Sequence, residues 1–101
     1  MKIKHLRDIQ RRPFATIVQD DNGHFGVSIC NDNDRFNKKL GVTIATGRAM
    51  VGSEPHYPNK KVSVAIPVGK GHYDLVHKTV EDHVYNVIQH MKNSKLTLSH
   101  F

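Results

Sequence analysis

The sequence predicts an α+β fold in which a small antiparallel sheet packs with two α-helices. Three observations lead to this prediction. Two segments with strand-type alternation flank an Asn-Gly turn, apolar residues recur at helical spacing in two later segments, and the chain has only 101 residues. At this length a second hydrophobic core would leave each part too small to bury enough apolar surface. We therefore expect one domain over residues 1–101.

The first predicted element is a β-hairpin. Residues 14–19 and 24–30 carry strand-type side chains on either side of the sequence Asp-Asp-Asn-Gly at 20–23. The Asn22-Gly23 pair readily adopts the positive φ angles of a type I′ turn, whose twist matches that of paired strands. Residues 1–6 could add an edge strand to this hairpin.

A helix is predicted to begin near Arg35, because the polar run at 31–34 can accept hydrogen bonds from the amides that open a helix. Its larger apolar residues share one face with Gly47, and small residues recur every four positions beside them. The first group is Phe36, Leu40, Ile44, Gly47 and Val51, and the second is Gly41, Ala45 and Ala49. A Gly/Ala strip lets a helix lie close to a sheet or another helix, so we interpret it as a packing surface.

The second half of the chain is expected to contain a loop, a strand and a long helix. Residues 52–59 include two prolines and should form an exposed loop. Residues 61–66 alternate as a strand, and the proline that follows favours a strand end or a sheet edge. The Gly-Lys-Gly sequence at 69–71 should then precede a helix over about 74–92. Residues 93–101 are expected to form a short strand or a frayed end. The apolar face of this helix would be Val76, Val80, Val84, Val87, Ile88 and Met91.

The charge balance favours an anionic partner. Fifteen Lys and Arg residues against nine Asp and Glu residues give a formal net charge of +6, which attracts phosphate in nucleic acids, nucleotides or anionic lipids. The basic residues form scattered pairs such as Lys60-Lys61, without the longer block that marks a nucleic-acid tail. Because Cys30 is the one cysteine and no long apolar run occurs, we expect a cytoplasmic protein without membrane contact. So small a chain is also expected to form a homo-oligomer.

The most informative candidate site runs from Gly69 to Tyr73, between a predicted strand and the predicted start of the last helix. Exposed amides and the positive end of a helix dipole would meet there, and Gly69 and Gly71 would let an anion approach the backbone. Lys70 adds a full charge, and His72 or Tyr73 would stack on or hydrogen-bond to a base. The spacing does not match the phosphate-loop motif, and a plain connector is the alternative.

Further candidates lie on the predicted helices and in the loop. Arg48 falls at the margin of the buried stripe, where it either extends its head to water or presents its planar guanidinium to a phosphate or carboxylate. Tyr57 is a candidate for contact with a base. A polar stripe at helical spacing follows one flank of the last helix and consists of Thr79, His83, Asn86 and His90. It could bind a ligand, form a subunit seam or be a solvated helix border.

The sequence predicts neither a metal site nor a catalytic centre. The eight histidines show no His-x-x-x-His spacing and no cysteine partner. Asp20, Asp21, Asp32 and Asp34 occupy turn or cap positions. Glu81 and Asp82 lie on the outer face of the predicted helix without an acid/base partner. We therefore expect a binding protein that has no cofactor.

Three consecutive segments carry a resemblance to a known family. The sequence Phe-Gly-Val-Ser-Ile-Cys at 25–30 is followed by Asp-Arg-Phe-Asn-Lys-Lys-Leu-Gly at 34–41 and Ile-Ala-Thr-Gly-Arg-Ala at 44–49. This order resembles small phage-encoded proteins, most of all the anti-Thoeris sponge family, which sequesters cyclic ADP-ribose-type immune signals and in some members cyclic oligonucleotides, without catalysis. The resemblance covers roughly residues 13–51. It implies a pocket with basic residues on the C-terminal helix, where this chain has histidines and lysines but no arginine.

The leading hypothesis is therefore a phage-type anti-defence protein, acting in the host cytoplasm, that captures a phosphate-bearing signalling nucleotide. The alternatives are a nucleic-acid-binding module, whose affinity would fall steeply with salt, and a protein that inhibits a host enzyme by surface contact. In the leading hypothesis the phosphates are held by Arg48, Lys70 and one of His83 and His90, and the base is contacted by Tyr73 or Tyr57.

Overall fold

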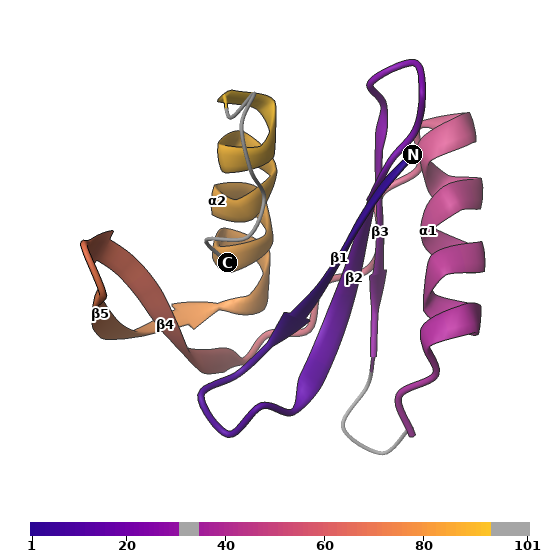
Figure 1. Ribbon diagram of the computed structural model, residues 1–101. Coiled ribbons are helices and arrows are strands. Elements are labelled where there is room, and N and C mark those ends of the chain that lie inside the picture. The colour runs from indigo at the N-terminus through magenta and orange to yellow at the C-terminus, as the bar shows by residue number, and fades with distance from the viewer. Residues whose placement is uncertain (31–34, 94–101) are drawn as a thin grey trace.

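The computed structural model describes residues 1–30 and 35–93, and this part of the chain forms five strands and two helices. The elements are β1 (Lys2–Arg7), β2 (Pro13–Gln19), β3 (Phe25–Ile29), α1 (Lys38–Val51), β4 (Lys61–Gly69), β5 (His72–Thr79) and α2 (Val80–Asn93). The predicted α+β class is confirmed (Figure 1). The expected capping run at 31–34 and the tail at 94–101 lie outside the described residues.

The strands form two separate antiparallel sheets. The first three pair in the order β1-β2-β3, and β4 and β5 form a two-stranded ribbon. The predicted hairpin and edge strand are both present, with Ile17 of β2 opposite Lys4 on one side and Val27 on the other. Figure 1 shows α1 and α2 on opposite faces of the three-stranded sheet, and the ribbon projecting away from it on the α2 side.

The hairpin turn is not the predicted type I′. The Gly23 amide donates to the carbonyl of Asp20 at 3.0 Å, and Gly23 has a φ of 86°, whereas Asn22 does not have a positive φ. This is a type I turn followed by a left-handed glycine. The Asp20 carboxylate accounts for the difference, because its Oδ1 accepts the amides of Asn22 at 3.0 Å and of His24 at 2.8 Å.

Helix α1 begins at Lys38, later than predicted, because Asn37 is its N-cap. The Asn37 Oδ1 accepts the Leu40 amide at 3.0 Å, which satisfies one of the amides that the first turn leaves without a helical partner. The helix ends at Val51, and Gly52 caps it with a left-handed φ of 70° and an amide that donates to the carbonyl of Arg48. A glycine at this position adopts the left-handed conformation without the steric cost of a side chain.

Small residues let α1 lie very close to the sheet. A Cβ on Gly26 of β3 would overlap the carbonyl oxygen of Ala45, and a Cβ on Gly41 would lie 2.9 Å from Thr16 Oγ1. The larger apolar residues beside the strip are more exposed to solvent: Leu40 is 56% and Val51 76% exposed. The predicted packing strip is confirmed, since the buried residues of α1 are Gly41, Ala45 and Ala49.

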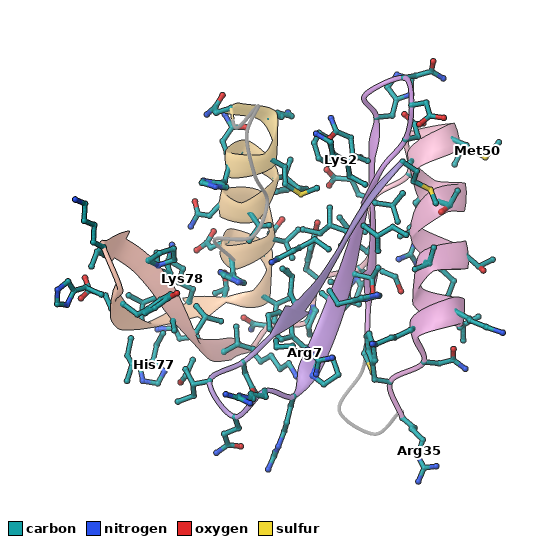
Figure 2. The ribbon with its side chains drawn as sticks, in the orientation of Figure 1. Lys2, Arg7, Arg35, Met50, His77 and Lys78 are labelled. Carbon is teal, nitrogen blue, oxygen red and sulfur yellow. The ribbon has the colours of Figure 1, made fainter. Side chains whose placement is uncertain are left out.

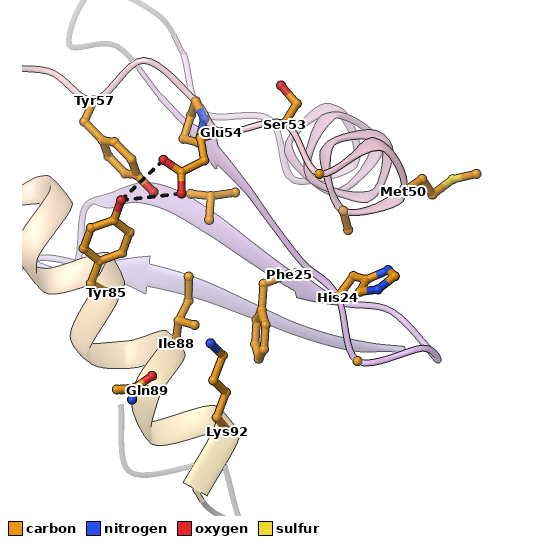
Figure 3. A pocket seen from close by; sticks show the side chains of 15 residues that line it. His24, Phe25, Met50, Ser53, Glu54, Tyr57, Tyr85, Ile88, Gln89 and Lys92 are labelled. Atoms are coloured by element: carbon orange, nitrogen blue, oxygen red, sulfur yellow. Dashed lines mark hydrogen bonds between the residues drawn. The ribbon is translucent and has the colours of Figure 1, made fainter.

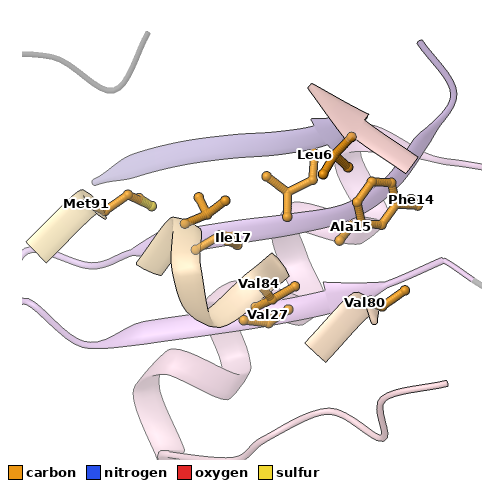
Figure 4. Packing of buried hydrophobic residues seen from close by; sticks show 10 residues of the cluster. Leu6, Phe14, Ala15, Ile17, Val27, Val80, Val84 and Met91 are labelled. Atoms are coloured by element: carbon orange, nitrogen blue, oxygen red, sulfur yellow. The ribbon is translucent and has the colours of Figure 1, made fainter. Parts of the chain in front are cut away.

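The main hydrophobic core lies between the opposite face of the sheet and α2 (Figure 4). Branched and long apolar side chains fill this space, so no close backbone approach of the kind seen at α1 is needed. From Val80 onward the predicted apolar face of the helix is confirmed. The cluster contains Leu6, Phe14, Ala15, Ile17, Val27, Val64, Val80, Val84, Val87 and Met91.

The predicted helical start near Asp74 is wrong. Residues 72–79 instead form β5, in which Val76 lies opposite Val64 of β4. The four-residue spacing between Val76 and Val80 is typical of one face of a helix. It is equally compatible with a strand that ends before Val80, because in both arrangements the Val76 side chain lies beside the core. Thr79 marks the boundary, since its Oγ1 accepts the Asp82 amide at 3.1 Å as an N-cap does.

Neither helix in the described part of the chain combines the length and the apolar character that a membrane span requires.

Candidate functional site

A hollow of about 600 Å³ lies where the end of α1, the start of β3 and one side of α2 come together (Figure 3). Three separate stretches of sequence therefore build one site: the hairpin turn with β3, the end of α1 with the loop after it, and α2. The lining residues are Gly23, His24, Phe25, Val27, Ala49, Met50, Gly52, Ser53, Glu54, Pro55, Tyr57, Tyr85, Ile88, Gln89 and Lys92.

Aromatic rings give the hollow its character. The Tyr57 and Tyr85 rings meet edge to face, with centroids 5.9 Å apart and an interplanar angle of 65°. Phe25 contributes a third ring, and the Nζ of Lys92 lies over it at 5.7 Å from the centroid. Such rings offer flat apolar faces to a planar ligand, and Lys92 places a positive charge beside one of them.

The two sides of the hollow differ in polarity. Figure 3 shows Glu54 with Tyr57 and Tyr85 on one side, and Lys92 beside Phe25 on the other. The Tyr85 hydroxyl donates to the Glu54 carboxylate, at 3.3 Å from Oε2 and 3.5 Å from Oε1. One side therefore offers a hydrogen-bond acceptor and the other a cation.

The tyrosine hydroxyls in the hollow stay protonated. Burial, assisted by the neighbouring Tyr85 and Glu54, raises the pKa of Tyr57 far above its ordinary value. Partial burial and the charge of Glu54 also raise the pKa of Tyr85. Since a protonated phenol can donate a hydrogen bond, Tyr57 is available as a donor to an anionic or carbonyl group of a ligand.

Of the predicted site residues, Tyr57 is the one that lines the hollow. Arg48 does not line the hollow but binds a residue that does: its Nη1 donates to the carbonyl of Val27 at 2.7 Å, and Val27 is a lining residue. The guanidinium is therefore engaged with the outer edge of β3, which is neither of the two arrangements expected for it. Its contact with a ligand remains a prediction.

The predicted phosphate cradle from Gly69 to Tyr73 lies elsewhere, at the turn of the β4–β5 ribbon. Gly71 has a φ of 72° and allows the turn, and no helix follows it because the chain continues into β5. The helix-dipole argument for this segment therefore fails. Lys70 and His72 are exposed and Tyr73 is 63% exposed, and Figure 1 shows the ribbon and α1 on opposite sides of the molecule, so Lys70 and Arg48 are not brought together.

The two histidines of the predicted polar stripe differ from each other. His83 is only 4% exposed, and its ring lies 6.0 Å from that of Phe14 between centroids. Its Nδ1 has no hydrogen-bond partner within the described residues. Burial, with a smaller contribution from Lys78, lowers the pKa of His83 to about 4. His83 is thus a neutral core residue, while His90 is half-buried on α2 and does not line the hollow.

Sequence reasoning missed most of the residues that line the hollow. Tyr85, Ile88 and Lys92 recur at helical spacing on α2, and this stripe of an exposed aromatic, an aliphatic and a basic residue was the signal that could have indicated them. Phe25 gave no such signal, because its position in a hairpin strand is equally typical of a core residue. Glu54 lies in a proline-containing loop whose path the sequence does not specify.

Within residues 1–30 and 35–93, no group of three or more metal-ligating side chains comes together. No protein-family model, curated protein or solved structure matches the chain.

Proposed function

We propose that this chain binds a nucleotide, or a molecule of similar chemistry, in the hollow between α1, β3 and α2. The observation that carries the proposal is the meeting of three aromatic rings with one lysine amino group in a space of about 600 Å³. This volume lies in the range of small-molecule sites, which combine apolar walls with a few polar groups. A planar ring that carries a phosphate matches that combination.

The rings favour a nucleobase or another flat heterocycle. Stacking on an aromatic side chain contributes on the order of 1–3 kcal/mol per base. Phe25 and Tyr85 come from different elements, so a ring placed between them would be held from β3 and from α2 at once. Glu54 could then accept hydrogen bonds from an exocyclic amine or from sugar hydroxyls.

The cationic side of the hollow favours a phosphate. Lys92 supplies one fixed charge next to Phe25, and His24 also lines the hollow. A charge-assisted hydrogen bond contributes roughly 1.5–3 kcal/mol. The net charge of +6 would in addition attract anionic ligands from a distance.

Sequestration without chemical change is the form of this function that we propose. The resemblance to the anti-Thoeris sponge family points to a cyclic ADP-ribose-type signal or a cyclic oligonucleotide as the first ligands to examine. Tyrosines with raised pKa values are donors rather than bases at neutral pH, which suits holding a ligand in place. An anti-defence role in a host cytoplasm would follow from the capture of such a signal.

Calorimetry with a panel of nucleotides tests the proposal. The panel contains cyclic ADP-ribose isomers, cyclic di- and trinucleotides and AMP. We expect at least one to bind, and Lys92→Met, which removes the charge but keeps the chain length, to weaken that binding about tenfold to a hundredfold. The matched control Lys61→Met, on the ribbon, should leave the affinity unchanged.

Three outcomes would contradict the proposal. The first is the absence of heat with every nucleotide, and the second is an equal loss of affinity in Lys92→Met and Lys61→Met. The third is binding that is confined to long nucleic acids and falls steeply with salt, which would instead favour a nucleic-acid-binding module. Mass spectrometry of the ligand after incubation tests sequestration separately, since a converted product would show catalysis.

A further inference from the structure

The described part of the chain has four strand edges: β1 and β3 in the sheet, and β4 and β5 in the ribbon. An edge strand presents unpaired amides and carbonyls to which another chain can add a strand, and natural proteins protect such edges with charges, bulges, prolines or covering groups. The four edges differ in this protection, and the difference identifies an interaction surface.

The two edges of the sheet are protected. β1 carries charged side chains, among them Lys2 and Arg7 (Figure 2), and its pairing with β2 becomes irregular between Leu6 and Arg7. On β3 the guanidinium of Arg48 occupies the outward carbonyl of Val27 at 2.7 Å. A strand from another molecule would have to displace this charge-assisted bond before it could pair with β3.

The edge formed by β4 is also occupied. The amide of Ile9 donates to the carbonyl of Ser63 at 2.9 Å, so the loop after β1 covers part of β4. Pro67 further along the strand has no amide to offer.

The outer edge of β5 has neither a covering loop nor a side chain on its outward carbonyls within the described residues. Its two charged residues, Asp74 and Lys78, are opposite in sign. Because the Ser63 carbonyl faces Ile9, it points away from β5, and in an antiparallel pair the residue opposite, His77, directs its own amide and carbonyl away from β4. Strand periodicity gives Tyr73 and Leu75 the same orientation. No other strand of the described chain pairs with this edge. The side chains at these positions are also open, Leu75 being 69% and Tyr73 63% exposed.

We propose that β5 pairs with β5 of a second copy of this chain about a twofold axis. The result is a continuous antiparallel sheet in the order β4-β5-β5′-β4′, where the prime marks the second copy. A two-stranded ribbon is only marginally stable by itself, and a sheet of four strands removes its exposed edge. The contact is isologous, so the same residues serve both copies and the assembly closes at two.

Charge complementarity favours a second copy and specifies the register. If Val76 lies opposite its own equivalent, antiparallel pairing places Asp74 opposite Lys78 of the second copy, and the symmetry creates this opposite-charge pair twice. Figure 2 shows His77 and Lys78 on opposite sides of β5, as strand alternation requires. Asp74 and Lys78 thus lie on one face of the new sheet, and Leu75 and His77 lie opposite each other on the other face.

A charge-swap series measured by sedimentation equilibrium tests the proposal. The parent protein should dimerise. Asp74→Lys and Lys78→Asp should each weaken the dimer about tenfold or more, because each replaces two attractive pairs by two repulsive ones. The double variant D74K/K78D restores both pairs with exchanged signs and should restore the dimer. Lys70→Asp, which changes the net charge by the same amount as Lys78→Asp but lies at the ribbon turn, should dimerise as the parent does.

Amide hydrogen exchange provides a readout that needs no variant. The amides of Tyr73, Leu75 and His77 should be protected at high protein concentration and lose protection on dilution. A protein that stays monomeric at every concentration would overturn the proposal. So would a dimer that neither single variant weakens, or exchange at these three amides that does not depend on concentration.

Discussion

Replacing His83 by glutamine should remove a large part of the acid sensitivity of the fold. His83 lies on α2 in contact with Phe14, is 4% exposed, and has its pKa lowered from 6.5 to about 4 by burial and by the charge of Lys78. The folded protein therefore holds the His83 ring in its neutral form. Unfolding exposes the ring to water, where it binds a proton at its ordinary pKa.

The sign and size of the effect follow from linkage. Between the two pKa values the unfolded chain binds more protons than the folded one, so stability is complete above the unfolded value and is lost as the pH falls toward the folded value. With 6.5 for the unfolded chain and about 4 for the folded protein, lowering the pH from about 7.5 to about 5 should reduce the free energy of unfolding by about 2 kcal/mol through His83 alone.

Urea unfolding at these two pH values measures the effect. We expect the parent protein to lose about 2 kcal/mol more than His83→Gln on acidification. Other histidines, including His5, whose pKa burial also lowers, contribute equally to both proteins and cancel in the comparison. The exposed His72 provides the control, and His72→Gln should retain the parental pH dependence. If His83→Gln showed the same pH dependence as the parent, the assignment of His83 as a neutral core residue would be refuted.

Further stability measurements test the packing of α1 and the protection of β3. Gly26→Ala should destabilise the protein by about 3 kcal/mol because its Cβ would overlap the α1 backbone, whereas Gly47→Ala, which points into open space, should stabilise it by about 0.5–1 kcal/mol; equal effects would contradict the close packing. Arg48→Met removes the bond to the Val27 carbonyl and should cost about 1–3 kcal/mol, and a neutral result in urea unfolding would show that this bond is weak. Asn37→Ala should cost about 1 kcal/mol through loss of the α1 N-cap, detectable as lower helix stability by circular dichroism; an unchanged unfolding midpoint would contradict that role.

The sequence correctly predicted the features that depend on neighbouring residues. Asn22-Gly23 between two alternating segments predicted the hairpin, and the Gly/Ala strip predicted close packing of α1. The turn type was wrong because a side chain, the Asp20 carboxylate, holds the amides of the turn. Even here the error was local and left the pairing of β2 with β3 unchanged.

The prediction from sequence was wrong where the same residues fit both a helical and a strand periodicity. Val76 and Val80 fit one face of a helix, and Val76 fits a strand equally well. The choice was decided by β4, whose residues pair with those of β5 along the ribbon, and a helix at 74–79 would have left β4 without any partner in the described chain. The helix-dipole argument for a phosphate near Gly69–Tyr73 failed with this helix, because it depended on a helix start after Gly71.

By itself the sequence determined the fold class, the hairpin, the packing strip of α1, the apolar face of α2 and the excess of positive charge. The hairpin, the packing strip and the apolar face depend on residues close together in the sequence, where periodicity and turn chemistry act. The charge is a sum over the whole chain. Only the tertiary structure decided that Phe25, Tyr57, Tyr85 and Lys92 share one hollow, that His83 is buried, and that the outer edge of β5 is uncovered. These properties depend on which distant segments meet, and the energies that bring them together come from burial and strand pairing across the whole chain rather than from any local pattern.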